Sequence, residues 1–323
     1  MKSSSQIAPS QASVVRFITI DSDQAHQRID NFLFTQLKGV PKSRIYRMLR
    51  KGEVRVNQGR IAASYKLQAE DVIRIPPVRI AQPGIPSSAP GGAWLENRIL
   101  YEDEAIVLLN KPASMAVHGG SGIAHGVIEA LRHRRPETAF LELAHRLDKG
   151  VSGCLLIAKK RSVLRHLHSS FRNDQVDKRY LALVLGNFPK TPQSVAVPLL
   201  KFVKQGGERM VKVAPDGKAA RTEFRCLSSN RALSFIEAKP LTGRTHQIRV
   251  HAAYLGHPIA GDERYGVAAE NAVLRRTGLK RIFLHAVSLS FIHPQSEERL
   301  TVEAPLDQEL LDTLAYHELA IKQ

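Results

Sequence analysis

The sequence predicts an α+β protein made of two domains, and three observations lead to this fold class. The chain has 323 residues, more than the ~100–200 residues of a usual domain. A stretch rich in proline, glycine and serine, residues 80–93, separates a short N-terminal part from a longer C-terminal part. In the longer part, strand-like segments are too often interrupted, and helical segments too few, for a regular parallel βαβ series. We therefore expect a mixed, mainly antiparallel sheet there.

The domain boundaries follow from composition. Residues 1–15 are rich in serine and glutamine and are expected to form a flexible tail. The first domain is expected over residues 16–79. The stretch 80–93 offers little that can pack in a core and is therefore expected to be a linker. The second domain is expected over residues 94–323, and no internal repeat is visible in it.

The first domain is expected to form two helices followed by short strands. Apolar residues recur at helical spacing in two segments, one with Ile29, Phe32, Leu33 and Leu37 and one with Ile45, Met48 and Leu49. Gly39 and Pro41 lie between the segments and end the first helix. Glu53–Val56 and Val72–Ile75 alternate like strands, and Asn57-Gln58-Gly59 has turn chemistry.

The second domain is richer in strand signals. Six apolar or alternating segments are predicted strands: Ile106–Leu109, Cys154–Ala158, Tyr180–Leu185, Thr222–Cys226, Leu233–Ala238 and Ile282–Phe291. Helical patterns lie between some of them, at Gly126–Arg134 and Ser162–Phe171.

The charge balance gives the first indication of a partner. Lysine and arginine number 47 against 30 acidic residues, a net charge of +17. Such a surplus attracts polyanions and releases counterions when phosphates are neutralised. The net charge alone does not show whether the partner is RNA, DNA or an anionic membrane surface. A surplus of basic residues also occurs in proteins that bind none of these.

The cysteines and the apolar runs indicate a compartment. Cys154 and Cys226 are the two cysteines, far apart and in no CxxC pattern. This argues against a disulfide framework or a structural zinc site and is typical of a reducing cytosol. No run approaches the ~18 apolar residues of a transmembrane helix, and the N-terminal residues lack the apolar stretch of a secretory signal. We expect a cytoplasmic protein without a membrane segment.

The positive charge is concentrated on the second predicted helix and the loop after it. Residues 28–79 contain twelve Lys or Arg and four acidic residues. Arg44, Arg47 and Lys51 are spaced to lie on one helical face, where like charges repel unless a polyanion neutralises them. A solvated face is the alternative, but the clustering favours phosphate binding.

These residues also carry a resemblance. The segment QRIDNFLFTQLKGVPKSRIYRMLRKGEVRVNQGR, residues 27–60, resembles the S4 (αL-type) RNA-binding domain. The resemblance implies binding of structured RNA through the second helix and adjoining loop, by phosphate and shape rather than by base sequence. The contacts it implies are Lys42, Ser43, Arg44, Arg47, Arg50, Lys51 and Asn57.

The sharpest motif of the second domain is the segment HRLDKGVSG, residues 145–153. It places Asp148 among basic neighbours, which favour an ionised carboxylate. Such an aspartate can act as a nucleophile, a base or a metal ligand. It can equally belong to a structural ion pair, and the motif's chemistry alone leaves these alternatives open.

The same segment resembles the HRLDxxTSG signature of the RluA family of pseudouridine synthases. Val151 stands where the family usually has threonine, which keeps the β-branched shape and loses a hydroxyl. Three further segments resemble blocks of the same family, and they occur in the same order. They are residues 109–112 with 117–120, residues 178–182 and residues 242–251. The resemblance spans the second domain and identifies the chain as a member of this family.

The resemblance implies that the protein isomerises uridine in RNA to pseudouridine. The C1′–N1 bond breaks and the base rejoins through C5, without redox change or net hydrolysis, so no cofactor and no metal are expected. Asp148 would attack either C1′ or C6 of a uridine that has left its helical stack. The S4 module indicates the ribosomal RNA branch of the family, with 23S rRNA as the partner, and a monomer is expected.

The resemblance also assigns roles around the aspartate. Arg146 would fill the position vacated by the base or grip phosphate, and Tyr180 would stack on the uracil. Arg249, in a block expected to be helical, would pair with Asp148, and Leu284 would pack on the base. A structural arginine and an ordinary core tyrosine are the alternatives for Arg146 and Tyr180. The remaining substrate-pocket residues that we expect are His145, Gly243 and Arg244.

Three other functions compete with this prediction. The same chemistry could act on tRNA or small-subunit rRNA. A non-catalytic ribosome-assembly factor could keep the fold, although it would not need Asp148, Tyr180 and Arg249 together. A metal-dependent nuclease is disfavoured because the sequence lacks clustered acidic residues and any HExxH or Cys/His metal motif.

Overall fold

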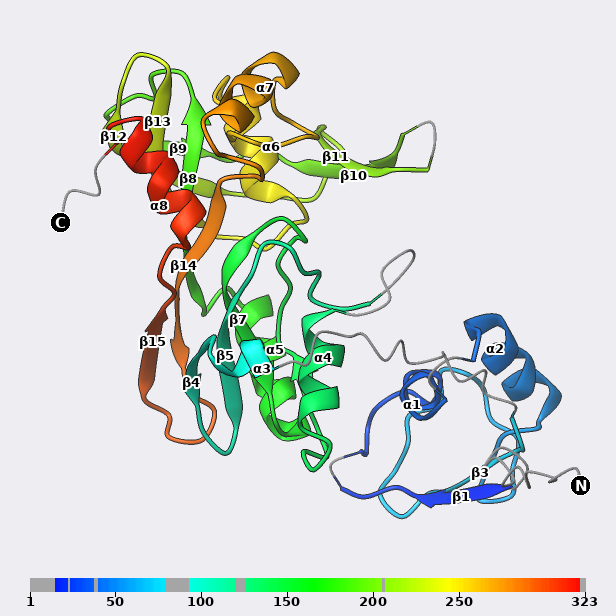
Figure 1. The fold of residues 1–323 in the computed structure, drawn as a ribbon. Coiled ribbons are helices and arrows are strands. Elements are labelled where there is room, and N and C mark those ends of the chain that lie inside the picture. The colour runs from blue at the N-terminus through cyan, green and yellow to red at the C-terminus, as the bar shows by residue number, and fades with distance from the viewer. Residues whose placement is uncertain are drawn as a thin grey trace, which may run out of the picture. The chain divides into compact units, whose positions relative to one another are not determined.

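The computed structural model describes residues 15–22, 24–37, 40–78, 93–119, 126–204 and 207–319. The chain divides into two compact units, Met1–Ala89 and Pro90–Gln323 (Figure 1). The predicted tail, residues 1–15, and the predicted linker, residues 80–93, lie almost entirely outside the described residues.

The described part of the first unit has two helices packed on a small sheet. Its elements are β1 (Arg16–Thr19), α1 (Ile29–Gln36), α2 (Lys42–Lys51), β2 (Arg55–Val56) and β3 (Val72–Ile75). The strands form an antiparallel sheet in the order β1-β3-β2. The predicted apolar stripes of both helices are buried, and they pack with Ile73 and Ile75 in one hydrophobic core. The strand predicted over residues 53–56 is shorter than expected, and β1 was not predicted.

Backbone conformation ends α2 and sets the turn behind it. Gly52 caps the helix with φ 68°, a left-handed conformation that glycine adopts without a steric penalty. Asn57 and Gln58 also have positive φ, 48° and 68°, in the segment where turn chemistry was predicted. The amide of Asn57 accepts from the N–H of Val72 at 2.9 Å and donates to Asp71 at 2.8 Å. These bonds fasten the turn to β3.

The second unit is built on one large sheet. Its strands are β4 (Ile99–Glu102), β5 (Ile106–Lys111), β6 (Glu142–Leu143), β7 (Ser152–Ala158), β8 (Asp177–Leu185), β9 (Gln193–Val195), β12 (Thr222–Ser229), β13 (Leu233–Pro240), β14 (Leu284–Ile292) and β15 (Arg299–Glu303). The order is β4-β5-β7-β14-β8-β13-β12-β9, with β15 on β14 and β6 on β7. Within the described sheet every pairing is antiparallel except that of β7 with β14. The predicted fold class is therefore confirmed, and all six predicted strands are present.

Helices cover both faces of this sheet. They are α3 (Ala93–Glu96), α4 (Val127–Arg134), α5 (Arg161–Arg172), α6 (Gln247–Tyr254), α7 (Ala268–Arg276) and α8 (Gln308–Tyr316). Alternate residues of β7 belong to different cores: Leu155 and Ile157 pack with α4 and α6, whereas Leu156 packs with α5. Helices α7 and α8 cover the same face as α5, but they pack on its β8 and β13. Because both faces are buried, β7 is a continuous apolar run rather than an alternating one.

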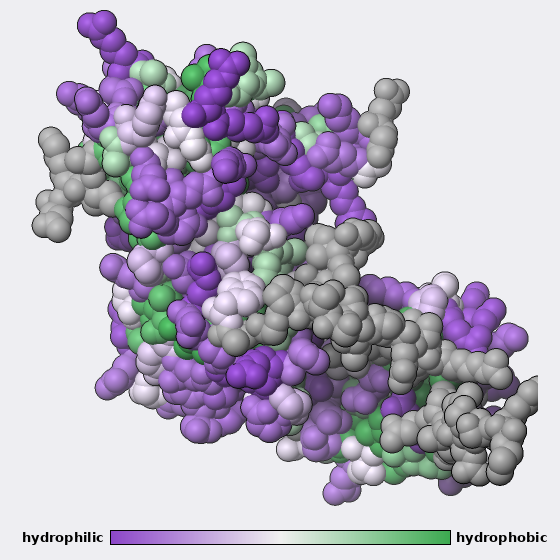
Figure 2. Space-filling view, in the orientation of Figure 1, coloured by the Kyte–Doolittle hydropathy of each residue, from purple (hydrophilic) through white to green (hydrophobic). Residues whose placement is uncertain are grey.

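A separate two-stranded ribbon lies beside the sheet. Strands β10 (Leu199–Val203) and β11 (Arg209–Val213) pair antiparallel, and β11 lies against α6. This ribbon was not predicted from the sequence. On the face seen in Figure 2, hydrophilic side chains predominate and hydrophobic residues appear only in small patches. No helix in the described ranges is both long enough and apolar enough to cross a bilayer.

Candidate active site

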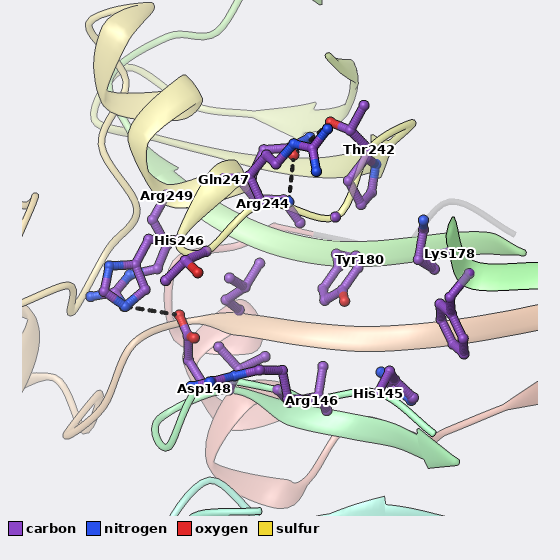
Figure 3. Close-up of a pocket in the computed structure, with 18 of the residues that line it drawn as sticks. His145, Arg146, Asp148, Lys178, Tyr180, Thr242, Arg244, His246, Gln247 and Arg249 are labelled. Carbon is purple, nitrogen blue, oxygen red and sulfur yellow. Dashed lines mark hydrogen bonds and ion pairs between the residues drawn. The ribbon is translucent and has the colours of Figure 1, made fainter. Parts of the chain in front are cut away.

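A cavity of about 290 Å³ lies in the second unit, where the loop before β7 faces α6 (Figure 3). Strand β8 and the first residue of β14 also reach it. All eight residues predicted from the motifs of the second domain line this one cavity: Arg146, Asp148, Tyr180, Arg249, His145, Gly243, Arg244 and Leu284. Segments more than 130 residues apart in the chain, from His145 to Leu284, thus meet at one place.

Asp148 is held between two apolar anchors. Leu147 and Val151 on either side of it are buried in the core, and the N–H of Val151 bonds to the carbonyl of Asp148 at 3.0 Å. The aspartate side chain remains 22% exposed and faces the cavity. Val151 stands where the family pattern has threonine. It packs among apolar residues, so no buried polar group needs a hydrogen bond there.

A buried lysine supports the same loop from below. Lys111 is fully buried, and its ammonium donates to the carbonyls of Pro112 at 2.8 Å, Met115 at 2.7 Å and Lys149 at 3.2 Å. Burial lowers its pKa to about 7, assisted by the charge of Arg281. One ammonium proton is available for each carbonyl. The lysine therefore ties β5 to the residue that follows Asp148, a role that was not predicted from the sequence.

Glycine is required where β7 leaves the loop. Gly153 has φ 110°, a conformation that side-chain-bearing residues rarely adopt. A Cβ there would collide with the backbone of Ala286 on β14. This close approach permits the single parallel pairing of the described sheet, in which His285 lies opposite Ser152. The pairing brings Leu284 next to the loop of Asp148.

Arg249 on α6 connects two aspartates. Its Nε lies 2.7 Å from Oδ2 of Asp262, and its Nη2 lies 2.8 Å from Oδ1. Its remaining nitrogen, Nη1, donates to Oδ2 of Asp148 at 3.1 Å. The predicted pairing of Arg249 with Asp148 is present in this geometry, and Asp262 was not foreseen.

Asp262 is a fully buried charge of the site. Its side chain is 0% exposed, and it also accepts the N–H groups of Arg264 at 2.9 Å and Tyr265 at 3.1 Å. Burial alone would raise its pKa, but the hydrogen bonds and charge of Arg249 outweigh that effect and hold the pKa below the ordinary aspartate value. The only sequence signal was an aspartate after glycine in GDERYG, which is too common to identify a site.

The turn before α6 is fixed by a buried glutamine. Gln247 accepts from the hydroxyl of Thr242 at 2.7 Å and from the N–H of Arg244 at 3.0 Å. Its amide nitrogen donates to the carbonyl of Arg221 at 2.9 Å and to Thr222 at 3.0 Å. Gly243 and Arg244 stay exposed on this turn, and the Nε of Arg244 bonds to the carbonyl of Ala219 at 3.0 Å. The turn therefore forms a rigid rim of the cavity.

Tyr180 and Leu284 present apolar surface to the cavity. They lie on adjacent strands, because Leu284 pairs with Ala182 in the antiparallel register of β8 and β14. Burial raises the pKa of Tyr180, and the negative charge of Asp148 raises it further, so the hydroxyl is protonated at neutral pH. Lys178, on the same face of β8, also lines the cavity, and burial lowers its pKa.

His145 and Arg146 differ sharply although they are neighbours. The ring of His145 stacks on Phe171, with centroids 5.0 Å apart, and its Nε2 accepts the N–H of Leu156 at 3.0 Å. Burial, aided by the charge of Lys178, lowers the pKa of His145 to about 3, so it is a neutral structural wall. Arg146 is exposed at the cavity, and none of the described carboxylates forms an ion pair with it.

The arrangement can hold one flat ring against a carboxylate. A volume of about 290 Å³ lies at the lower end of the ~300–1,000 Å³ typical of ligand pockets, which suits a single nucleobase with its sugar. A carboxylate fixed by arginine stands at one side, and an aromatic and an aliphatic side chain line the floor. Such a site favours reaction of an electrophilic carbon of a nucleotide with the carboxylate.

The first unit offers a separate cationic surface. Six of its predicted RNA contacts are exposed along α2: Lys42, Ser43, Arg44, Arg47, Arg50 and Lys51. Asn57 is exposed as well, but its amide is engaged with β3 and with Asp71. Its assignment as an RNA contact stays a prediction, and the contacts that it makes within the unit are structural.

The fold and the cavity define the class of protein. The family model described as RNA pseudouridylate synthase matches residues 105–254, which include Asp148, Tyr180 and Arg249. The S4 domain model matches residues 27–73. Relatives that are 53% identical extend over 92% of the chain. The chain therefore belongs to the RNA pseudouridylate synthase family, carries an S4 domain, and is an RNA pseudouridine synthase.

The particular proteins it resembles share one name. Ribosomal large subunit pseudouridine synthase C of Yersinia pestis is 53% identical over 300 residues, covering 92% of this chain and 94% of that protein. The protein of the same name from Escherichia coli strain K12 is 53% identical over 301 residues, with the same coverage of both. Among solved structures, Human RNA Pseudouridylate Synthase Domain Containing 4 has a TM-score of 0.59 at 25% identity, covering 70% of this chain and 95% of that one. The predicted family is confirmed.

Proposed function

We propose that this enzyme converts uridines of 23S ribosomal RNA to pseudouridine, with Asp148 as the nucleophile that attacks a uridine flipped out of its helix. The observation that carries the proposal is the placement of the Asp148 carboxylate. It stands in a nucleotide-sized cavity, 3.1 Å from the guanidinium of Arg249. The relatives that are 53% identical are named for the large ribosomal subunit, which supports 23S rRNA as the substrate.

The reaction balances within one nucleotide. Asp148 attacks C1′ of the ribose or C6 of the uracil, and the C1′–N1 bond breaks. The freed base turns and forms the C1′–C5 bond. C5 loses its proton, N1 gains one, and the carboxylate is released. The proposal therefore needs no cofactor.

Three residues complete the proposed mechanism. Arg249 balances the charge of Asp148 and aims it, while Asp262 holds the arginine from the other side. The ring of Tyr180 stacks on the uracil; its raised pKa favours a neutral phenol over a phenolate base. Arg146, exposed at the rim, occupies the position that the flipped base vacates.

The S4 unit supplies affinity rather than chemistry. Its exposed lysines and arginines along α2 neutralise phosphates of structured RNA and so supply a salt-dependent share of the binding. We further propose that the enzyme works as a monomer in the cytoplasm, where its two free cysteines, Cys154 and Cys226, remain reduced.

The decisive variant is Asp148→Asn, which keeps the size of the side chain and removes its negative charge. We expect pseudouridine formation on 23S rRNA to be abolished while RNA affinity stays within a few-fold. Asp216→Asn makes the same chemical change on an exposed turn and should retain full activity. Wild-type rates from Asp148→Asn would refute the mechanism.

The target RNA needs its own experiment. Pseudouridines mapped across total RNA from cells with and without the gene should disappear from 23S rRNA alone. If pseudouridines are lost only from tRNA or small-subunit rRNA, the proposed substrate is wrong but the proposed chemistry stands. No loss anywhere, together with retained binding to ribosomal precursors, would instead favour a non-catalytic assembly factor.

A further inference from the structure

A chain of hydrogen-bonding groups leads from the β10–β11 ribbon to the reactive carboxylate. The N–H of Val211 donates to the hydroxyl oxygen of Tyr265 at 3.0 Å. That oxygen lies 2.7 Å from Nδ1 of His246. The other ring nitrogen, Nε2, lies 3.6 Å from Oδ2 of Asp148, as the dashed line in Figure 3 marks. No motif and no matched name assigns a role to this chain of groups.

The backbone is bent to place His246 there. The residue precedes α6 with φ 54° and ψ 19°, in the left-handed region. That conformation is uncommon for a residue with a side chain, although histidine is among those that adopt it. Residues held in this region persist where their surroundings over-determine them, and they cluster at functional sites. In this conformation His246 lines the cavity (Figure 3).

The tyrosine decides which ring nitrogen carries the hydrogen. A phenol has one proton to donate, and the N–H of Val211 already supplies a donor to its oxygen. Within the described residues, Nδ1 of His246 is the acceptor in reach of the Tyr265 hydroxyl. The hydroxyl therefore donates to Nδ1, which must be unprotonated. In the neutral imidazole the hydrogen then sits on Nε2, the nitrogen that faces Asp148.

The ring is neutral at the pH of the cell. Burial lowers the pKa of His246 below the ordinary histidine value. The negative charges of Asp148 and Asp262 oppose this shift, whereas the positive charges of Arg249 and Arg264 reinforce it. A neutral imidazole in one tautomer has a single N–H donor. Here that donor is Nε2–H, which faces Asp148.

Arg264 is the one described neighbour that opposes this tautomer. It is paired with Glu208 at 2.8 Å, and its Nη1 lies 3.5 Å from Nε2 of His246. A guanidinium only donates hydrogen bonds, so it gains nothing from a protonated Nε2. The contact is long and exposed, whereas the contact of Tyr265 with Nδ1 is short. The short contact therefore determines the tautomer.

Both neighbours of the Asp148 carboxylate contact the same oxygen. Arg249 donates to Oδ2 at 3.1 Å, and Nε2 of His246 lies 3.6 Å from Oδ2. Among the described side chains, none donates a hydrogen bond to Oδ1 of Asp148. The two oxygens of the carboxylate thus have different environments, one held by the protein and one free to meet the substrate.

We propose that His246 is a positioning residue. Tyr265 sets its tautomer, its Nε2–H donates to Oδ2 of Asp148, and Oδ1 is thereby presented to the nucleotide as the attacking oxygen. The inference rests on the proposed role of Asp148 as nucleophile. The distance of 3.6 Å is longer than a hydrogen bond, and catalytic hydrogen bonds of this kind tighten when substrate fills the site.

The first test reads the tautomer directly. Full-length protein labelled with ¹⁵N in its histidine rings is observed by long-range proton–nitrogen correlation, and His246→Gln identifies the signal of His246. We expect the neutral form with hydrogen on Nε2. In Tyr265→Phe, which keeps the ring that lies 5.0 Å from the Arg249 guanidinium, we expect a mixture of tautomers. Hydrogen on Nδ1, or a protonated ring at pH 7, in the wild-type protein would overturn the proposal.

The second test separates positioning from folding. His246→Ala should lower kcat by about 10- to 100-fold, since misplacing a reacting group by ~1 Å can cost about 100-fold, with KM for RNA nearly unchanged. His246→Gln can place an amide N–H near the position of Nε2. Its kcat should therefore be close to that of the wild-type enzyme. Tyr265→Phe should also lower kcat. Exposed His133 and Tyr254 provide the matched controls His133→Gln and Tyr254→Phe.

The outcomes are distinct. Full kcat in His246→Ala, or equal damage in His246→Gln and His246→Ala with a lowered Tm in both, would show that the residue is merely structural. If the wild-type enzyme forms no pseudouridine in 23S rRNA, the proposed function fails, whereas the tautomer measurement on the free protein still tests the arrangement of Tyr265, His246 and Asp148.

Discussion

Arg249 and Asp262 form two parallel hydrogen bonds, 2.7 and 2.8 Å long, and the aspartate of this pair is completely shielded from solvent. The pair fixes the plane of the guanidinium before any substrate arrives. The third nitrogen of Arg249 is then left pointing at Asp148. Asp148 therefore pairs with an arginine, Arg249, whose position is fixed by Asp262.

Removing the charge of Asp262 should damage both stability and rate. Asp262→Asn breaks a buried ion pair from one side, which costs about 3–5 kcal/mol in comparable cases, and it frees Arg249 to rotate. We expect a lowered Tm and a reduced single-turnover rate. Glu263→Gln is the control, because the neighbouring pair of Glu263 with Arg275 is exposed and contributes little. Equal behaviour of the two variants in thermal unfolding would contradict this account.

His145 predicts how stability responds to acid. Its pKa is about 3 in the folded protein against an ordinary value of 6.5. Unfolding therefore takes up a proton between these values, and the free energy of unfolding falls as the pH drops from about 6.5 toward 3, by at most ~1.4 kcal/mol per pH unit. His145→Gln can still accept the N–H of Leu156 but does not titrate.

The measurement compares the wild-type protein with His145→Gln in denaturant unfolding at a series of pH values below 7. The stability advantage of the wild type should shrink steadily on acidification. An advantage that stays constant with pH would mean that His145 is not held neutral.

Arg146 should matter most where the uridine has to be extracted from a helix. Flipping a stacked base costs a few kcal/mol, and least when the base is already single-stranded. Arg146→Ala should therefore lower kcat/KM strongly on a helical rRNA fragment and weakly on an unstructured oligonucleotide. Arg231→Ala, at an exposed position between β12 and β13, is the control. An equal loss of kcat/KM on both substrates would show that Arg146 binds phosphate or stabilises the fold instead.

The α2 surface should govern the salt dependence of binding. The double variant Arg44→Gln/Arg47→Gln should weaken rRNA binding and reduce the slope of log affinity against log salt by about one for each phosphate that is no longer neutralised. The matched double variant Arg16→Gln/Lys66→Gln removes the same charge from exposed positions elsewhere in this unit. An identical slope for both would show that net charge, and not the helix surface, drives binding. Deleting residues 1–90 should give a larger loss with the same trend.

Local patterns predicted the local structure well. The periodicity of Ile45, Met48 and Leu49 marked the buried side of α2, and alternation marked β3 with its observed bounds. The β10–β11 ribbon was missed because its strands are short and largely exposed, so neither carries a strong apolar pattern. The order of the large sheet was also beyond prediction, since it depends on pairings between strands that are distant in the chain.

The site was predictable only where a motif carried it. Asp148, Tyr180 and Arg249 were named from family blocks, Leu284 was named outside them, and all four lie around one cavity. Asp262 and the Tyr265 hydroxyl could not be found in this way. Their roles arise from a turn that folds back onto α6, and no spacing in GDERYG distinguishes it from an ordinary polar turn. His145 was expected in the substrate pocket, and it is there, but as a neutral wall.

The place of β14 in the sheet has a consequence for biosynthesis. This strand inserts between β7 and β8 and supplies Leu284, yet it is among the last elements of the chain to be synthesised. Without it, β7 after Asp148 and β8 with Tyr180 lack the strand that both of them pair with. The cavity therefore has all of its lining strands only after the C-terminal part of the chain has folded.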